Sequence, residues 1–185
     1  MELGYVCTPE EVFDFWFVEC GREHWFDATL DLDRKIRQRF QDTHLALSRG
    51  VTDVWRSTPE NRLAAVIVLD QFPRNIYRST PLAFATDGLA LQEAKLALEI
   101  GADQQVSVEC RTFFYMPFEH CEDLDEQDRA VALFKRLGDE EYIDYALRHR
   151  EVIAAHGRFP HRNAIVGRKS TEAELEYLAQ PGAGF

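Results

Sequence analysis

Residues 58–72 run Thr-Pro-Glu-Asn-Arg-Leu-Ala-Ala-Val-Ile-Val-Leu-Asp-Gln-Phe, and this stretch decides the fold class. The apolar run from Leu63 to Leu69 alone has the composition of a buried strand. The preceding Thr-Pro-Glu, however, is typical of a helix start, with a capping threonine and a proline at the first helical position. This start and the length of the segment to Phe72 favour a fully buried helix. We therefore expect a helix over residues 59–71.

The same start signal recurs along the chain. Thr8-Pro9-Glu10-Glu11 has the arrangement of a capping box, and Thr171 with Glu174 forms a second one. No alternating strand pattern or Asn-Gly hairpin signal accompanies these starts. The sequence therefore predicts an all-α protein with about eight helices in antiparallel pairs. The expected ranges are 9–20, 31–48, 59–71, 81–100, 107–115, 125–137, 139–156 and 171–179.

Composition sets the broad class of the protein. The chain has 185 residues, of which 45% are hydrophobic, so we expect one globular domain over residues 1–185. A formal net charge of −11 argues against general binding to nucleic acid or to anionic membranes. The start of the chain lacks the pattern of a signal peptide, and the four cysteines form no CxxC pair. A cytoplasmic protein without metal, cofactor or disulfide is the expectation.

Two segments place polar residues around a Phe-Pro step. Gln71-Phe72-Pro73-Arg74-Asn75 is echoed by Gly157-Arg158-Phe159-Pro160-His161-Arg162-Asn163. Proline removes a backbone donor and fixes φ, so we expect both segments to interrupt a helix. Arginine and asparagine at two such breaks indicate a binding site or a buried structural network.

These two segments, together with Phe15-Trp16-Phe17 and the run from Phe114 to His120, resemble the domain-of-unknown-function 924 family of bacterial proteins. The resemblance covers nearly the whole chain. It implies an α-helical fold similar to the tetratricopeptide-like superfamily, and it implies no activity. Two residues depart from the family pattern: Cys121 stands where serine is usual, and His156 where an aromatic residue is usual. Neither inherits a family role.

Asp70 is the most informative single residue of the first segment. A buried carboxylate at a helix end needs a cationic partner, and Arg74 and Arg162 are the candidates. The pair either orients an arginine that binds ligand or locks two helix ends together. We expect Arg74 to be the structural partner and Arg162 to face ligand.

A second constellation consists of Glu119, His120 and Glu122. Because it follows Pro117, we expect it at the start of a new helix or turn, where backbone N–H groups favour anions. His120 beside a carboxylate is a candidate general acid or base, and a histidine that merely closes the loop is the structural alternative. The order of these residues matches no metal-binding motif, and His149 is expected to be a core histidine.

Three functions remain open at this level. In the first, a pocket formed by residues 70–75, 117–122 and 158–163 binds a small anionic ligand. In the second, the same pocket is catalytic; in the third, the motifs are structural and the protein is an interaction scaffold. A protein partner or a homodimer is compatible with any of them. The candidate catalytic residues are His120, Glu122 and Asp70, and the candidate ligand-binding residues are Arg74, Asn75, Glu119, Arg158, His161, Arg162 and Asn163.

Overall fold

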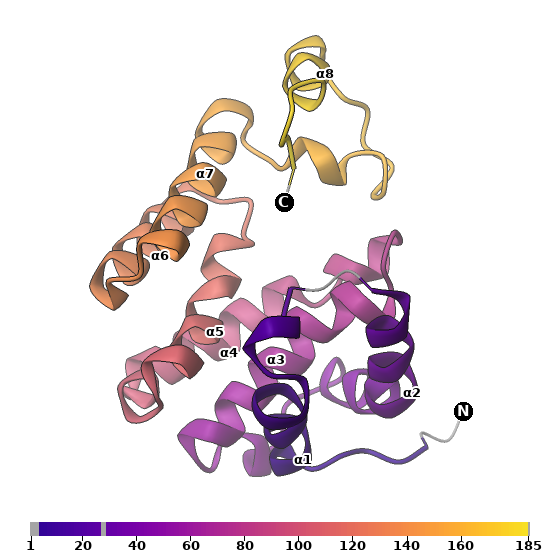
Figure 1. Cartoon of the computed structure of the whole chain (residues 1–185), viewed down its shortest axis with the longest axis vertical. Coiled ribbons are helices and arrows are strands. Elements are labelled where there is room, and N and C mark those ends of the chain that lie inside the picture. The colour runs from indigo at the N-terminus through magenta and orange to yellow at the C-terminus, as the bar shows by residue number, and fades with distance from the viewer. Residues whose placement is uncertain (1–3, 27–28, 185) are drawn as a thin grey trace. The chain divides into compact units, whose positions relative to one another are not determined.

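A computed structural model describes residues 4–26 and 29–184, and every regular element within these ranges is helical (Figure 1). The predicted all-α class and the eight predicted helices are confirmed. Shorter 3-10 and π segments connect them, among them the π-helix η1 (Phe15–Cys20), which continues α1. The α-helices are α1 (Pro9–Asp14), α2 (Leu30–Leu47), α3 (Pro59–Ile76), α4 (Asp87–Glu99), α5 (Val108–Glu119), α6 (Leu124–Leu137), α7 (Glu140–His156) and α8 (Glu172–Leu178).

The predicted caps explain where several of these helices begin and end. The side chain of Thr8 accepts from the backbone N–H of Glu11, and Glu11 reaches back to the N–H of Thr8, so the expected capping box is present. Thr58 caps α3 through its side chain, which accepts from the backbone N–H of Asn61. At the other end, α7 stops where Gly157 adopts the left-handed conformation with φ 69°, which glycine enters without steric cost.

The helix break predicted at Pro73 is wrong, because α3 continues through it to Ile76. Proline at this position leaves the carbonyl of Leu69 without its helical N–H donor. The hydroxyl of Thr86 donates to that carbonyl at 2.6 Å and replaces the missing hydrogen bond. Arg74, in the next turn, donates through Nη1 to the carbonyl of Asp70. Asp70 therefore lies inside a helix and not at its end.

The new helix or turn expected after Pro117 does not begin there, because α5 runs through this proline to Glu119 and the turn begins at His120. The surrounding turns are held by packing: the side chains of Phe113, Phe114 and Phe118 are at most 1% exposed. Tertiary burial of this kind outweighs the unfavourable helix propensity of proline. Glu119 consequently lies at the carboxyl end of a helix, where the backbone presents carbonyl groups and not N–H groups.

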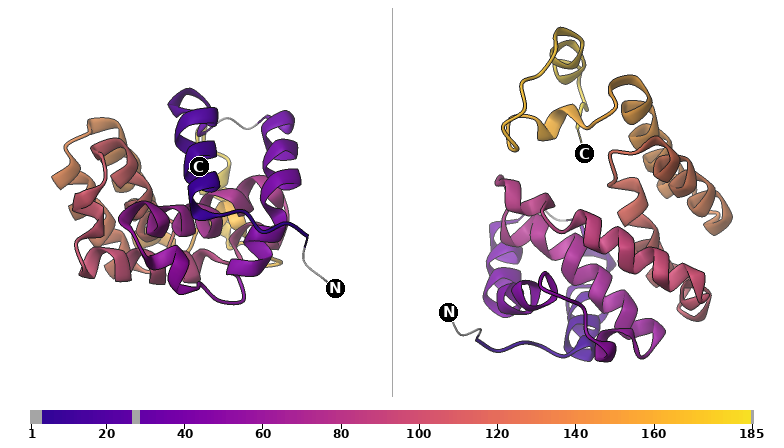
Figure 2. Two further views of the ribbon diagram at one scale, coloured as in Figure 1. Left: turned by 90° about the horizontal axis from the view of Figure 1, so that it is seen from below. Right: turned by 180° about the vertical axis from the view of Figure 1, so that it is seen from behind.

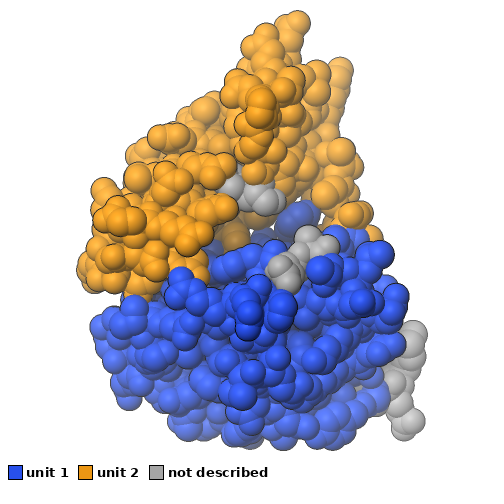
Figure 3. Space-filling model, viewed as in Figure 1, with its two compact units in different colours: residues 1–78, 82–117 blue, residues 79–81, 118–185 orange. Residues whose placement is uncertain are grey.

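The chain divides into two compact units, shown in different colours in Figure 3. Unit 1 comprises residues 1–78 and 82–117, and unit 2 comprises residues 79–81 and 118–185. In unit 1, α3 is the central helix, and α1, α2 and α4 pack against it. Its run from Leu63 to Leu69 is at most 1% exposed, as expected for a fully buried helix.

Unit 2 is built on the helix pair α6 and α7, which lie side by side in Figures 1 and 2 and are joined by Gly138 and Asp139. Beyond α7, the chain turns through the 3-10 segment η6 (Pro160–Arg162) and then enters α8. Phe159 is fully buried at this turn and packs with Val152 and Ile153 of α7. The second Phe-Pro step therefore does interrupt the helical path, as predicted.

Packed helix pairs of this kind are compatible with a tetratricopeptide-like arrangement. Within the described ranges, no helix is both long enough and apolar enough to cross a membrane.

Candidate functional site

In unit 1, Asp70 and Arg74 form the ion pair expected from their spacing. Asp70 is completely buried, its Oδ1 lies 3.5 Å from Nη1 of Arg74, and its Oδ2 accepts from the amide of Gln71 at 2.6 Å. Arg74 also binds both carboxylate oxygens of Asp87, at 3.0 and 3.2 Å. Burial works against the charge of Arg74, but attraction to Asp70 and Asp87 outweighs it, so the pKa of Arg74 is raised. Arg74 thus links α3 to α4.

Asn75 belongs to a second polar group at the end of α3. Its amide donates to Oδ1 of Asp33 at 2.9 Å, and Arg78 binds the same carboxylate through two hydrogen bonds of 2.6 and 2.7 Å. Arg37 of α2 donates to the terminal carbonyl of Ile76 at 2.9 Å. These contacts attach the carboxyl end of α3 to α2.

A third contact chain in unit 1 has no counterpart in the sequence motifs. Thr86 gives its proton to the carbonyl of Leu69, so its oxygen must accept from Nε2–H of His44, which lies 3.2 Å away. The other ring nitrogen, Nδ1, then accepts from the hydroxyl of Tyr77 at 3.3 Å. This series of hydrogen bonds requires a neutral imidazole, and burial lowers the pKa of His44 to about 4.

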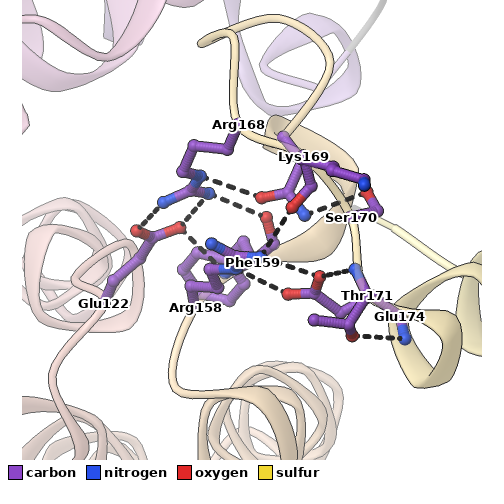
Figure 4. A network of polar contacts seen from close by, with 9 residues as sticks. Glu122, Arg158, Phe159, Arg168, Lys169, Ser170, Thr171 and Glu174 are labelled. Atoms are coloured by element: carbon purple, nitrogen blue, oxygen red, sulfur yellow. Dashed lines mark hydrogen bonds and ion pairs between the residues drawn. The ribbon is translucent and has the colours of Figure 1, made fainter.

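In unit 2, Glu122 binds an arginine. Arg168 holds both oxygens of this carboxylate at 2.5 and 2.8 Å, and the backbone N–H of Phe159 donates to Oε1 at 2.8 Å (Figure 4). Burial alone would raise the pKa of Glu122, but the hydrogen bonds from Arg168 and Phe159 more than compensate and lower it. Glu122 therefore anchors the turn at Phe159, and its partnership with His120 stays a prediction.

Arg158 and Asn163 hold the same turn to the segment that follows. Arg158 donates to both oxygens of Glu174, at 2.6 and 2.8 Å, and to the carbonyl of Lys169 at 3.0 Å (Figure 4). Asn163 accepts from Nε of Arg168 at 2.8 Å and donates to Ser170 at 3.1 Å. These contacts give Arg158 and Asn163 structural roles; ligand binding by either residue stays a prediction.

The most distinctive chemistry of unit 2 is a buried pair formed by Glu119 and His149. Nδ1 of His149 lies 2.8 Å from Oε1 of Glu119 and 2.9 Å from the backbone carbonyl of Tyr145. Both side chains are 7% exposed. A carbonyl oxygen only accepts, so Nδ1 must carry the proton, and the basic nitrogen of the neutral ring is Nε2. A carboxylate holding Nδ1–H is the arrangement that orients a histidine for proton transfer.

His149 is buried as the sequence predicts, but its carboxylate partner was missed. Thirty positions separate the two residues, and Glu119 was expected at a helix start. No local spacing signals such a pair. The only indication in the sequence is that each residue lies near a motif of the family pattern. Glu119 belongs to the run from Phe114 to His120, and His149 lies on the helix that leads into Gly157.

Two further histidines and an arginine lie near His149 or near Phe159, which packs against it. The ring of His120 lies 6.3 Å from that of His149, and His149 in turn meets the edge of Phe159 at 5.6 Å. The ring centre of His161 lies 5.5 Å from that of Phe159, and the guanidinium carbon of Arg162 lies 4.5 Å from the same Phe159 ring centre. Burial, together with the nearby charge of Arg162, lowers the pKa of His161 to about 4.

Among the predicted site residues, the structure therefore brings together Glu119, His120, Glu122 and the segment 158–163 within unit 2. Asp70 with Arg74, and Asn75 in a separate polar group, lie within unit 1. A single pocket formed by all three segments stays a prediction. Within the part of the chain that the structure describes, no three histidine, cysteine or carboxylate side chains are grouped to hold a metal ion.

Comparison with known proteins agrees with the fold. The family profile described as "Bacterial protein of unknown function (DUF924)" matches residues 12–182. A solved structure of a protein of unknown function from Agrobacterium tumefaciens, ATU0120, is 42% identical, with a TM-score of 0.88 over 92% of this chain and 96% of that one. No curated protein matches the chain. The matched range covers nearly the entire sequence, and the chain accordingly belongs to the DUF924 family of bacterial proteins.

Proposed function

We propose that unit 2 binds a small anionic molecule beside the Glu119–His149 pair. The single observation that supports this most strongly is the pair itself, a buried carboxylate fixing the tautomer of a buried histidine. Strongly coupled ionisable groups in a protein interior cluster at functional sites, because each carries a desolvation cost that packing alone does not require.

An anion is the ligand class that fits the neighbouring groups. Arg162 supplies a positive charge that is only 8% exposed, held against the ring of Phe159. The ring of His120 lies 6.3 Å from that of His149, and the ring of His161 lies 5.5 Å from that of Phe159, so both supply ring N–H donors to this part of unit 2. Hydrogen bonds from such groups to a carboxylate or phosphate oxygen are among the stronger ones in proteins. The overall charge of −11 makes binding by general electrostatic attraction unfavourable, so recognition depends on these local donors.

A second candidate is catalysis at the same place. Because Nδ1 of His149 is held by Glu119 and Tyr145, Nε2 would be the atom that accepts or donates a proton, with His149 in the role that the sequence assigned to His120. Binding is the first proposal because it requires only the donors present, whereas catalysis also requires a substrate placed against Nε2.

The test is a titration with acetate and with inorganic phosphate, followed by isothermal calorimetry and amide NMR shifts. Arg162→Gln should weaken binding at least about tenfold, the effect of losing one charge-assisted hydrogen bond. The matched control is Arg150→Gln, because Arg150 of α7 pairs with Asp128 of α6. Failure of both anions to shift any unit 2 amide would overturn the proposal, as would unchanged affinity in a folded Arg162→Gln protein.

A further inference from the structure

We propose that residues 179–184, which follow α8, form a strap that closes over His161, and that the strap opens before an anion binds to this part of unit 2. The ligand is that of the proposed function, on which this inference rests, whereas the strap itself follows from contacts within unit 2. Such a strap controls access to the site.

The path of the strap is set by turns directly after α8 (Figures 1 and 2). The backbone N–H of Gln180 donates to the carbonyl of Tyr177 at 3.0 Å, and that of Ala183 donates to the carbonyl of Gln180 at 3.2 Å. Gly182 and Gly184 have positive φ angles of 77° and 92°, which residues with side chains rarely adopt. These turns bring Gly184 back to Tyr177 of the preceding helix.

At Gly184 the strap lies directly against the side chain of His161. A Cβ atom on Gly184 would be 3.3 Å from Cβ of His161, which is closer than ordinary van der Waals contact, and 3.6 Å from its Cγ. Glycine therefore allows the backbone to approach this closely. Ala183 and Gly184 are partly buried, whereas residues 179–182 are exposed. A ligand reaches this side of the histidine only after Gly184 has moved away.

Tyr177 fastens the strap at the same place. Its hydroxyl accepts from the backbone N–H of Gly184 at 3.3 Å, and its ring packs against the buried cluster that contains Phe159. The ring centre of Phe159 lies 5.5 Å from that of His161. The strap, Tyr177 and His161 therefore meet at the turn that carries the proposed anion site.

The closed form of the strap is held weakly enough to open. The hydrogen bond of 3.3 Å from Gly184 to Tyr177 is slightly longer than the usual range. Ordering two glycines costs more conformational entropy than ordering other residues. Segments with few buried apolar contacts open locally while the rest of the domain stays folded. Opening would hydrate the ring of His161, whose pKa burial lowers to about 4 in the closed form.

The two forms predict the sign of the effect on binding. An anion that binds only the open form has an apparent dissociation constant that is raised by the closed population. A change that favours the open form should therefore tighten binding, even though it removes a contact from the protein. A strap that instead held the ligand in place would give the opposite sign.

Tyr177→Phe tests the strap, because it removes the hydroxyl that accepts from Gly184 and keeps the ring. Reaction of His161 with diethyl pyrocarbonate, followed by mass spectrometry of the peptides, should become about two- to tenfold faster. This is the equilibrium shift expected from the loss of one hydrogen bond. His24, which is exposed in unit 1, is the internal reference and should react at an unchanged rate.

The matched control is Tyr5→Phe, which removes a hydroxyl that donates to Glu11 in unit 1. Its His161 should react as in the wild type. Gly184→Val opens the strap by a second route, because a branched side chain is strained at φ 92° and would be too close to His161. Far-ultraviolet circular dichroism verifies that each variant is folded.

Anion binding is then measured by calorimetry with acetate and with inorganic phosphate. In Tyr177→Phe and in Gly184→Val, the dissociation constant should decrease by at least about twofold, in parallel with the faster modification of His161. Tyr5→Phe should leave the dissociation constant unchanged.

Three results separate the claims. Unchanged modification of His161 in both folded variants would overturn the strap. Faster modification with unchanged or weaker anion binding would overturn the control of access and leave the binding site in place. If neither anion binds the wild type or either variant, the proposed function and the control of access are both overturned, and the modification rates alone decide whether the strap exists.

Discussion

At the residue scale, Thr86 explains how α3 accommodates a proline. Its hydroxyl replaces the N–H that Pro73 lacks and also accepts from His44. Thr86→Val keeps the shape of the side chain but removes the donor, leaving a buried carbonyl and a buried ring nitrogen without their partner. We expect a loss of about 1–3 kcal/mol in the free energy of unfolding, measured by denaturant melts.

Two further variants control this prediction. Thr52→Val should be nearly neutral, because Thr52 is exposed and its side chain makes no capping hydrogen bond. Pro73→Ala returns a backbone N–H to the helix, so Thr86→Val should cost less in that background. Equal costs in both backgrounds would contradict the role assigned to Thr86.

His44 provides a pH prediction at the same scale. Its pKa in the folded protein is about 4, below the ordinary value of 6.5, because burial disfavours the charged ring. The unfolded chain therefore binds this proton more readily, and stability must fall as pH decreases from about 6.5 towards 4. We expect a loss on the order of 2–3 kcal/mol across that window, and a smaller loss in His44→Gln. His161, whose pKa is lowered similarly, will contribute to the remaining slope. An identical pH profile in wild type and His44→Gln would contradict the hydrogen bonds assigned to a neutral His44.

At the element scale, the helices were largely predictable, whereas the effects of the prolines were not. Caps such as Thr8 with Glu11 act within four residues, so the sequence contains everything that places those ends. Pro73 and Pro117 were expected to stop helices, and neither does. The compensating groups come from other elements: Thr86 lies 13 positions beyond Pro73. Long-range compensation of this kind leaves no local sequence pattern.

The same limit applies to the candidate site. Asp70 with Arg74 was predictable, since the two residues lie four apart on one helix. Glu119 with His149 and Glu122 with Arg168 were not, because 30 and 46 positions separate the partners. Sequence patterns indicated which segments carry polar chemistry, but the pairing depends on how α5, α7 and the turn at Phe159 pack.

The turn at Phe159 gives an element-scale prediction. Glu122→Gln removes one charge from a pair with Arg168 and weakens the hold on the Phe159 backbone. We expect about 1–3 kcal/mol of destabilisation, with faster amide exchange over residues 157–171. Glu151→Gln, at an exposed position of α7, is the control and should leave both measurements unchanged. Unchanged exchange in Glu122→Gln would mean that apolar packing of Phe159 holds the turn by itself.

At the scale of the whole molecule, the family assignment is secure and carries no activity with it. The polar groups of the two units have different roles. In unit 1, Arg74, Asn75 and Thr86 link α3 to its neighbours. The polar groups of unit 2 both fasten a turn and surround a histidine whose tautomer is determined. Functional experiments therefore belong on unit 2, whichever ligand they use.

The most direct measurement is nitrogen-15 NMR of the histidine rings, with His149 assigned by comparison with His149→Gln. In the free protein, Nδ1 of His149 should be protonated, because it donates to the carbonyl of Tyr145. Addition of acetate should shift the ring nitrogen signals of His149, while those of His156 stay unchanged. If His149 instead carries its proton on Nε2 in the free protein, or if saturating acetate leaves its ring nitrogens unaltered, then the anion site centred on Glu119 and His149 is contradicted.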